Sequence, residues 1–106
     1  MTGAGGGPPF RLVLAPEAEA TWEGLRRLDS VKWKRVNKAL RLLKADPRHP
    51  GLNCHKWDIL KGKGPRGEDI WTAYVENNTP GAWRLFFVYS AQDPGLIEVT
   101  SIRRHS

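Results

Sequence analysis

The sequence lacks the features that mark membrane, secreted and fibrous proteins. Its single cysteine, Cys54, cannot form an internal disulfide, which is typical of a reducing compartment. Its longest apolar run, residues 85–88 (LFFV), is far too short to cross a bilayer. Residues 1–10 (MTGAGGGPPF) have neither the basic nor the apolar region of a secretory signal. We therefore expect a cytoplasmic protein with no membrane association, and we exclude disulfide-rich secreted scaffolds and collagen-like chains.

The common cofactor and metal motifs are also missing. The chain has no P-loop and no dinucleotide fingerprint, and its glycine-rich residues 3–7 follow no predicted strand. His49, His55 and His105 do not have the spacing of zinc ligands, with or without Cys54. No serine lies in a nucleophile elbow. We therefore expect no metal and no cofactor, so that any enzymatic chemistry must come from the side chains alone.

The composition that remains is that of one small globular domain. The chain has 106 residues, of which 40% are hydrophobic and 26% are charged. A chain of this length buries enough surface to form a core without disulfides. Residues 1–9 are rich in glycine and proline and have nothing to bury, so they are predicted to be a disordered lead-in. Residues 10–106 are predicted to form a single domain.

Positive charge is concentrated in the middle of the chain. Between Arg26 and Arg66, thirteen lysines and arginines accompany three aspartates, which gives this block a net charge of +10 within a chain of +6. A field polarised in this way favours nucleic acid or an acidic protein partner, and it predicts binding that weakens with salt. The alternative is a solvated helix face that keeps the protein soluble.

Two helices are predicted in the first half of the chain. Pro16 and the acidic residues after it are typical of a helix start, and apolar periodicity continues over 16–28. Ser30 is expected to cap a second helix, which ends at Asp46-Pro47 because the residue before a proline avoids helical geometry. The predicted apolar faces are Ala18, Trp22, Leu25 and Leu28 in the first helix, and Val36, Ala39, Leu40 and Leu43 in the second.

Short strands are predicted on both sides of these helices. Residues 82–90 are the most apolar segment and are expected to be the central strand. In the last strand, Ile97, Val99 and Ser101 alternate with polar residues and are expected to share one face. The order β-α-α-β-β-β-β predicts an α+β fold, with a two-helix hairpin on one face of a small, mostly antiparallel sheet. The predicted strands are 10–14, 57–61, 69–76, 82–90 and 96–103.

Five segments in order, FRLVLAPEA, ALRLLKADPRHPGL, WDILKG, AWRLFFVY and SIRRH, resemble the RelE/ParE superfamily of toxins from type II toxin–antitoxin pairs. Within it, they are most similar to the YoeB-like messenger-RNA endonucleases. The resemblance covers residues 10–105 and implies a RelE/ParE-like, microbial RNase-like fold. It implies a toxin that cuts messenger RNA on the ribosome and is held inactive by a cognate acidic antitoxin protein, and it allows a homodimer.

The resemblance assigns catalysis to Asp58, Arg84 and His105. Metal-independent cleavage of RNA uses the ribose 2′-hydroxyl as nucleophile and needs a base, a cation at the phosphate and an acid for the leaving oxygen. Asp58 would be the base, Arg84 the phosphate clamp and His105 the acid. This chain departs from the branch in two places, because the branch has glutamate at the position of Asp58 and tyrosine at that of Ser106.

Further basic residues are expected to bind the substrate or a partner. Trp71 and Trp83 are candidates for stacking on a base. The residues expected to contact RNA or its phosphates are Lys56, Lys61, Lys63, Arg66, Arg103 and Arg104, and those expected to dock on the ribosome or a partner are Lys34, Arg35, Lys38 and Arg41.

Each catalytic candidate also has a purely structural interpretation. Asp58 can form a surface ion pair with a neighbouring lysine, Arg84 can anchor a partner protein, and His105 can belong to a loose terminus. Two other functions also stay open. The chain can be a ParE-like toxin that inhibits DNA gyrase without catalysis, or a degenerate, solitary module that binds RNA or protein.

Overall fold

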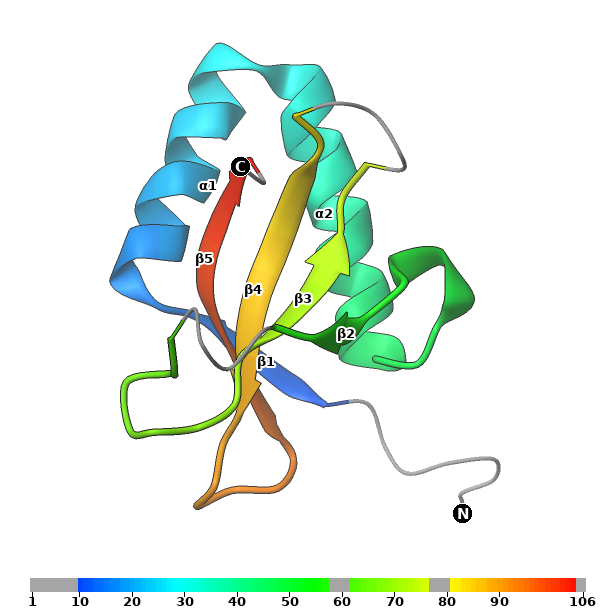
Figure 1. Cartoon of the computed structure of the whole chain (residues 1–106). Helices are drawn as coiled ribbons and strands as arrows, with labels where there is room; N and C mark the ends of the chain where they lie inside the picture. The colour runs from blue at the N-terminus through cyan, green and yellow to red at the C-terminus, as the bar shows by residue number, and fades with distance from the viewer. Residues whose placement is uncertain (1–9, 58–61, 77–80, 105–106) are drawn as a thin grey trace.

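The fold is that of a computed structural model, which describes residues 10–57, 62–76 and 81–104. Two helices lie side by side on one face of a five-stranded sheet (Figure 1). The elements are β1 (Arg11–Leu14), α1 (Pro16–Leu28), α2 (Ser30–Ala45), the 3-10 helix η1 (Pro50–Leu52), β2 (His55–Lys56), β3 (Trp71–Tyr74), β4 (Trp83–Tyr89) and β5 (Leu96–Arg104).

The strand order across the sheet is β1-β5-β4-β3-β2. β1 runs parallel to β5, whereas the other neighbouring pairs are antiparallel. The predicted α+β fold, with a helical hairpin on a mostly antiparallel sheet, is confirmed, and β4 is the central strand as predicted. The lead-in predicted for residues 1–9 lies outside the described residues.

One aspartate joins the two helices. The backbone N–H of Asp29 donates to Leu25, which closes α1, and the Asp29 carboxylate accepts from the N–H of Lys32, which caps α2. The prediction that Ser30 caps the second helix is therefore wrong by one residue. Because the Asp29 carboxylate fills the capping role, Ser30 is free to be the first residue of α2.

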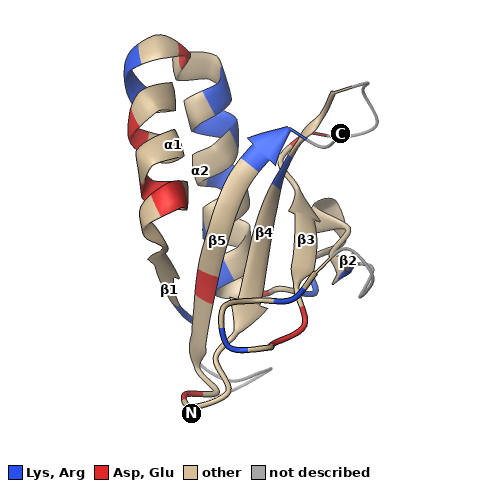
Figure 2. Cartoon of the chain, turned by 60° about the vertical axis from the view of Figure 1, so that its left-hand side comes forward, with Lys and Arg blue, Asp and Glu red and all other residues tan. Residues whose placement is uncertain are grey.

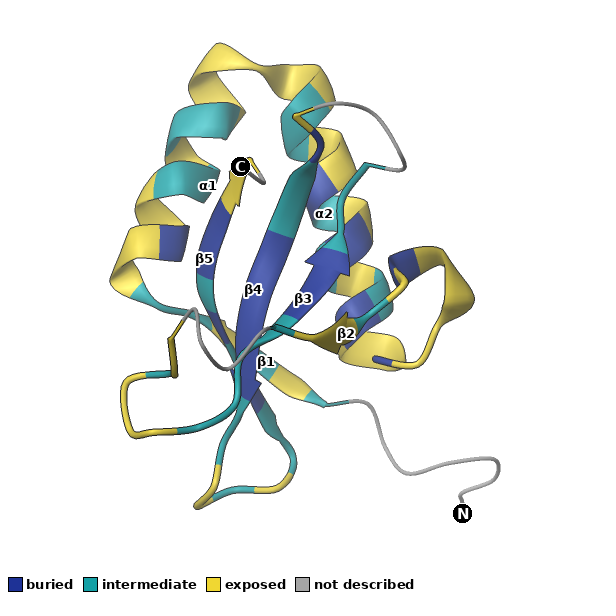
Figure 3. Cartoon of the chain, viewed as in Figure 1, coloured by how far each residue is buried: buried dark blue, intermediate teal, exposed yellow. Residues whose placement is uncertain are grey.

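The core lies between the helices and the sheet. Val36 and Leu43 of α2 are completely buried, as are Leu85 and Phe87 of β4, and all four belong to one cluster. Figure 3 shows this burial along the middle of the sheet, with the joint between the helices exposed beyond it. Leu28 lies at that joint and is 81% exposed, so the prediction that it joins the apolar face of α1 is wrong.

A β-bulge divides β5 into two parts. Phe86 of β4 pairs with Ser101, but the next residue, Phe87, pairs with Val99, so Thr100 is an extra residue on β5. An extra residue reverses which side chains face the helices. Val99 therefore joins the core cluster under the helices, whereas Ser101 shares the opposite face with Phe86. The predicted alternation is confirmed for Ile97 and Val99 and is wrong for Ser101.

The second strand differs most from its prediction. The described strand is His55–Lys56, whereas the prediction was 57–61. The prediction is wrong at Trp57, which follows β2 outside the strand, and its residues 58–61 lie outside the described residues. β2 is a two-residue edge strand with exposed, polar side chains, and such a strand has no apolar pattern to reveal it. The Trp57 N–H still donates to Ile70, so the chain stays beside the segment that leads into β3 for one residue beyond β2.

Candidate functional site

The face of the sheet opposite the helices carries the candidate site. Leu85 faces the core, so its neighbours Arg84 and Phe86 point to the opposite side. Residues paired across the ladders share this side, because paired side chains lie on one face. We call it the helix-free face, and it comprises Thr72, Tyr74, Arg84, Phe86, Ser101 and Arg103.

Arg84 is half-buried on this face and contacts Tyr74. Its Nη2 donates to the Tyr74 hydroxyl at 2.9 Å, and its guanidinium carbon lies 4.3 Å from the centroid of the Tyr74 ring. Its Nε is buried without a hydrogen-bond partner, and no carboxylate among the described residues forms an ion pair with it. The site therefore presents a partly desolvated cation with hydrogen-bond donors to spare.

Two more arginines extend this positive charge along β5. Arg103 pairs directly with Arg84 across the ladder, and its guanidinium lies 4.2 Å from the centroid of the Phe86 ring. Arg104 is the next residue, so it lies on the other side of β5, opposite Trp83 and against Gly81, the residue whose left-handed backbone (φ +73°) turns the chain into β4. Like charges opposite each other in a sheet repel, so this arrangement favours an anionic ligand between them. We call Arg84, Arg103 and Arg104 the arginine cluster.

The basic residues at the other end of the helix-free face are in a different state. Here Gly64 approaches Val88 so closely that a Cβ at this position would lie 2.8 Å from the valine side chain. Asp69 forms ion pairs with Lys63 at 2.6 Å and Lys56 at 3.3 Å, and hydrogen bonds from these two lysines lower the pKa of its carboxyl. We call this region, which comprises Lys56, Lys63, Gly64 and Asp69 and the loop between Lys63 and Asp69, the covered end.

Arg66 is neutralised at the covered end as well. It forms ion pairs with Glu68 at 3.2 Å and with Glu98 of β5 at 3.1 Å. The structure thus separates the predicted phosphate-binding residues into two groups. Lys56, Lys63 and Arg66 have carboxylate partners, whereas Arg103 and Arg104 have none among the described residues. Figure 2 shows the basic residues at the end of β5, away from those near the covered end.

No sequence pattern pointed to Glu76, the carboxylate with the most hydrogen-bond partners among the described residues. It accepts hydrogen bonds from Lys32 Nζ and Arg35 Nη1, both at 2.8 Å, and from the backbone N–H of Trp83 at 3.1 Å. Burial raises its pKa, but these hydrogen bonds outweigh burial and hold the pKa below its usual value. Glu76 therefore ties α2 to both strands that carry Arg84 and Tyr74.

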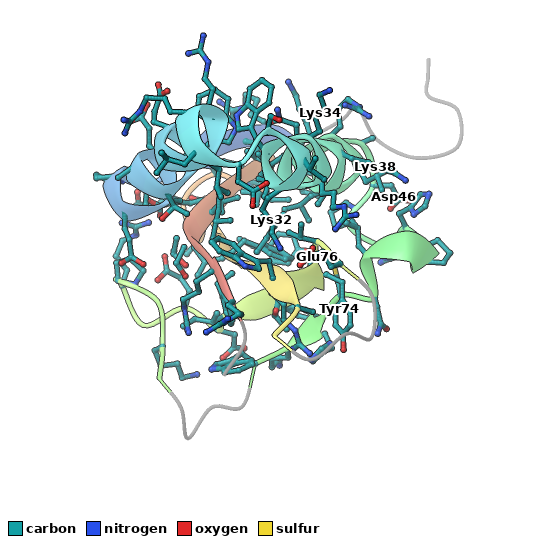
Figure 4. All side chains as sticks on the ribbon, turned by 90° about the horizontal axis from the view of Figure 1, so that it is seen from above. Lys32, Lys34, Lys38, Asp46, Tyr74 and Glu76 are labelled. Atoms are coloured by element: carbon teal, nitrogen blue, oxygen red, sulfur yellow. The ribbon has the colours of Figure 1, made fainter. Side chains whose placement is uncertain are left out.

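The predicted docking residues differ in whether they form an ion pair with Glu76. Arg35 is partly neutralised by Glu76, whereas Lys34, Lys38 and Arg41 are exposed and have no ion-pair partner among the described residues. Figure 4 shows Lys34 and Lys38 projecting outward from α2, while Lys32 points inward to Glu76. The outward surface of α2 thus carries exposed positive charge.

A groove of about 710 Å³ lies between α2, η1 and the end of β3. Ala39, Leu42 and Leu52 make part of its lining apolar. Lys38 adds an unpaired positive charge, whereas Arg35 and Glu76, which also line the groove, pair with each other. Concave, largely apolar surfaces with a few charged groups are typical of binding sites. The lining suits a partner segment with both apolar and acidic side chains.

The remaining candidates are placed as follows. Asp58, Lys61 and His105 lie outside the described residues, so only Arg84 of the predicted catalytic set is located.

Burial is the main cause that raises the pKa of the Cys54 thiol to about 11, so it is protonated at neutral pH. Within residues 10–57, 62–76 and 81–104, no group of three His, Cys, Asp or Glu side chains could hold a metal. No helix in these ranges is long and apolar enough to span a membrane.

Several solved toxin structures share this fold. The YoeB/ParE toxin from Agrobacterium tumefaciens matches with a TM-score of 0.66 and 19% identity, over 91% of this chain and 99% of that one. The YoeB dimer from Staphylococcus aureus matches with a TM-score of 0.65 and 14% identity, over 93% and 100% of the two chains. The archaeal RelE–RelB complex from Pyrococcus horikoshii OT3 gives 0.62 and 12%, over 92% and 96%.

No protein-family model matches the sequence, and no curated protein matches it. At identities of 12% to 19%, the structural likeness shows the fold. The chain therefore has the fold of the RelE/ParE toxins and of YoeB in particular, as the resemblance in its sequence implied.

Proposed function

We propose that this protein is the toxin of a type II toxin–antitoxin pair and that it cuts messenger RNA on the ribosome, in the cytoplasm. The observation that carries the proposal is the arginine cluster. Arg84 and Arg103 stand side by side on the helix-free face, and Arg104 follows at the same end of β5; none of the three has a carboxylate partner among the described residues, in a chain that neutralises several of its other cations. Unpaired, partly buried arginine is the side chain best suited to a phosphate.

The proposed reaction needs no metal. The ribose 2′-oxygen attacks the adjacent phosphorus, a P–O bond forms, and the bond to the 5′-oxygen breaks. Asp58 takes the proton of the 2′-hydroxyl and His105 gives a proton to the departing 5′-oxygen, so the protons balance. Arg84 stabilises the extra negative charge on the phosphorus oxygens. The roles of Asp58 and His105 rest on the sequence resemblance, and that of Arg84 rests on its place in the structure as well.

Two other surfaces support partners of opposite character. The outward cations of α2, Lys34, Lys38 and Arg41, suit ribosomal RNA. The groove beside α2 suits an antitoxin segment with acidic and apolar residues. The solved neighbours include RelE with RelB and YoeB with YefM, as well as a YoeB dimer, and we extend both kinds of assembly to this protein as proposals.

The test is translation of a reporter message in a bacterial cell-free system, with new 5′ ends mapped by primer extension. Wild type is compared with Arg84→Ala and His105→Ala. The matched control is Arg26→Ala, because Arg26 is an exposed arginine of α1 whose only described ion pair is a long one to Glu23. We expect cuts within translated codons for wild type and the control, and their loss in the two site variants.

The same preparations separate the alternatives. Intact messages together with inhibited DNA supercoiling by gyrase would support the ParE-like function instead. Intact messages and unaffected gyrase, with RNA binding retained, would support the solitary binding module. Either result would remove the nuclease proposal.

A further inference from the structure

The phenol of Tyr74 makes two separate contacts with the Arg84 guanidinium. Its oxygen accepts a hydrogen bond from Nη2 at 2.9 Å, and its ring lies under the guanidinium carbon at 4.3 Å from the centroid. Tyr74 extends from β3 on the side of the sheet away from the helices (Figure 4). One side chain therefore fixes both the position and the plane of the proposed phosphate clamp.

Among the described residues, no other hydrogen bond or ion pair orients the guanidinium of Arg84. It has no ion pair there, and its Nε has no hydrogen-bond partner. A free arginine side chain samples many rotamers, and holding it against a ligand costs conformational entropy. Contacts that order the guanidinium before the phosphate arrives reduce that cost, which is the usual benefit of preorganisation.

Tyr74 is itself held by its surroundings. The ring of His55, on the edge strand β2, meets the Tyr74 ring edge-on with 6.4 Å between centroids. Tyr74 and Arg84 are direct partners in the β3–β4 ladder, so their backbones are in fixed register. Beyond this pair, the Tyr74 hydroxyl makes no other hydrogen bond among the described residues. Its polar group is thus devoted to Arg84 rather than shared with a structural network.

We infer that Tyr74 is a positioning residue of the phosphate site, which acts on RNA through Arg84. The inference rests on the proposed function, because it takes RNA phosphate as the ligand of Arg84. It assigns the Tyr74 hydroxyl a task distinct from that of the ring. The ring supports the guanidinium plane, and the hydroxyl selects one orientation of the guanidinium within that plane.

A double-mutant cycle tests this dependence directly. Tyr74→Phe keeps the ring and removes only the hydroxyl, and it is made in the wild-type and the Arg84→Ala backgrounds. The readouts are the Kd for a short fluorescein-labelled single-stranded RNA, from anisotropy, and the cleavage rate in the cell-free system. We expect Tyr74→Phe to weaken RNA binding by about 3- to 10-fold when Arg84 is present, the size of one hydrogen bond. In the Arg84→Ala background it should change binding less than about 2-fold.

The chain supplies a matched control in its other tyrosine, Tyr89. Tyr89 lies at the opposite end of β4 and packs against Phe10, Trp71 and Phe87. Tyr89→Phe removes a hydroxyl from the same strand pair of the sheet without touching the arginine cluster, so its RNA affinity and cleavage should equal those of wild type. Urea unfolding of every variant shows whether the fold is retained.

The outcomes separate the two levels of the proposal. An active wild type in which Tyr74→Phe has no effect, or has the same effect with and without Arg84, overturns the positioning role and leaves the nuclease proposal standing. A wild type that neither binds nor cleaves RNA overturns the proposed function and this inference together. A loss that depends on Arg84 supports both.

Discussion

The two ends of the helix-free face carry the same kind of side chain in opposite states. At the covered end, Arg66 contacts Glu68 and Glu98. At the other end, Arg84 and Arg103 contact aromatic rings and no described carboxylate. Net charge does not distinguish these arginines, since each contributes one unit. What makes an arginine available to a phosphate is the absence of a carboxylate partner, and the fold decides that absence.

Replacing one arginine from each end with alanine, in separate variants, should give the largest difference in cleavage rate. Arg84→Ala should lower cleavage by about 100-fold or more, the size of losing a preorganised donor to a developing negative charge. Arg66→Ala should lower it by less than about 3-fold, because an exposed, already paired arginine contributes little. Primer extension of a translated message measures both. Equal losses would show that the pairing of the arginines does not matter.

The contrast between paired and unpaired cations extends to α2, because removing Glu76 leaves a cation of this helix without its carboxylate partner. Glu76→Ala leaves the largely buried ammonium of Lys32 without its carboxylate, and should lower the free energy of unfolding by about 3 kcal/mol. Urea denaturation measures this change. Glu23→Ala breaks only an exposed pair in α1 and should cost less than about 0.5 kcal/mol. Similar costs for the two variants would contradict a stabilising role for the largely buried Lys32–Glu76 ion pair.

The pH dependence of stability follows from the same carboxylate. Hydrogen bonds from Lys32, Trp83 and Arg35 outweigh the effect of burial and hold the folded pKa of Glu76 below its ordinary 4.5. A group with a lowered folded pKa stabilises the protein above its unfolded pKa and loses that contribution as pH falls through the folded value. The stability difference between wild type and Glu76→Gln should therefore be constant near neutral pH and shrink below 4.5. Urea titrations across acid pH test this, and a difference that grows on acidification would contradict it.

The salt dependence of RNA affinity is a finer measure of which cations are free to bind phosphate. Arg103→Ala should reduce the slope of log affinity against log salt for single-stranded RNA by about 0.7, as expected for one lost phosphate contact. Lys63→Ala should change the slope less, because Asp69 already neutralises Lys63. Anisotropy titrations at several salt concentrations provide the slopes. A larger change for Lys63→Ala would reverse the assignment of the two ends.

The smallest effect is expected from releasing paired cations. Asp69→Asn removes the carboxylate shared by Lys56 and Lys63, so both become available to a polyanion. We expect slightly tighter RNA binding with a steeper salt dependence, and unchanged cleavage positions. The same anisotropy and primer-extension experiments apply. Weaker binding would mean that Asp69 positions these lysines for RNA instead of withholding them.

Local patterns in the sequence were enough to predict the helices and the central strand. The apolar spacing of α2 and the uninterrupted apolar residues of β4 are properties of single segments. The bulge beside Ser101 and the short strand β2 were not predictable in this way. A bulge depends on how two strands pair, and β2 has only polar side chains to mark it.

The site shows the same limit. Arg84 was identifiable as a charged residue inside an apolar strand, and the resemblance pointed to it too. Glu76 and Tyr74 were not identifiable, because their importance comes from partners elsewhere in the chain. Glu76 meets Lys32 from 44 residues away, and Tyr74 meets Arg84 across a strand pair. No motif or periodicity in one segment carries that information.

The position of β5 has a consequence for the order in which the protein is made. β5 follows every other described element in the chain, yet it lies between β1 and β4. During synthesis, β1 and β4 are therefore made before the strand that lies between them. Arg103 reaches its place beside Arg84 only when β5 inserts between its neighbours. The arginine cluster is thus assembled only after β5 has been made, later than every other described element of the fold.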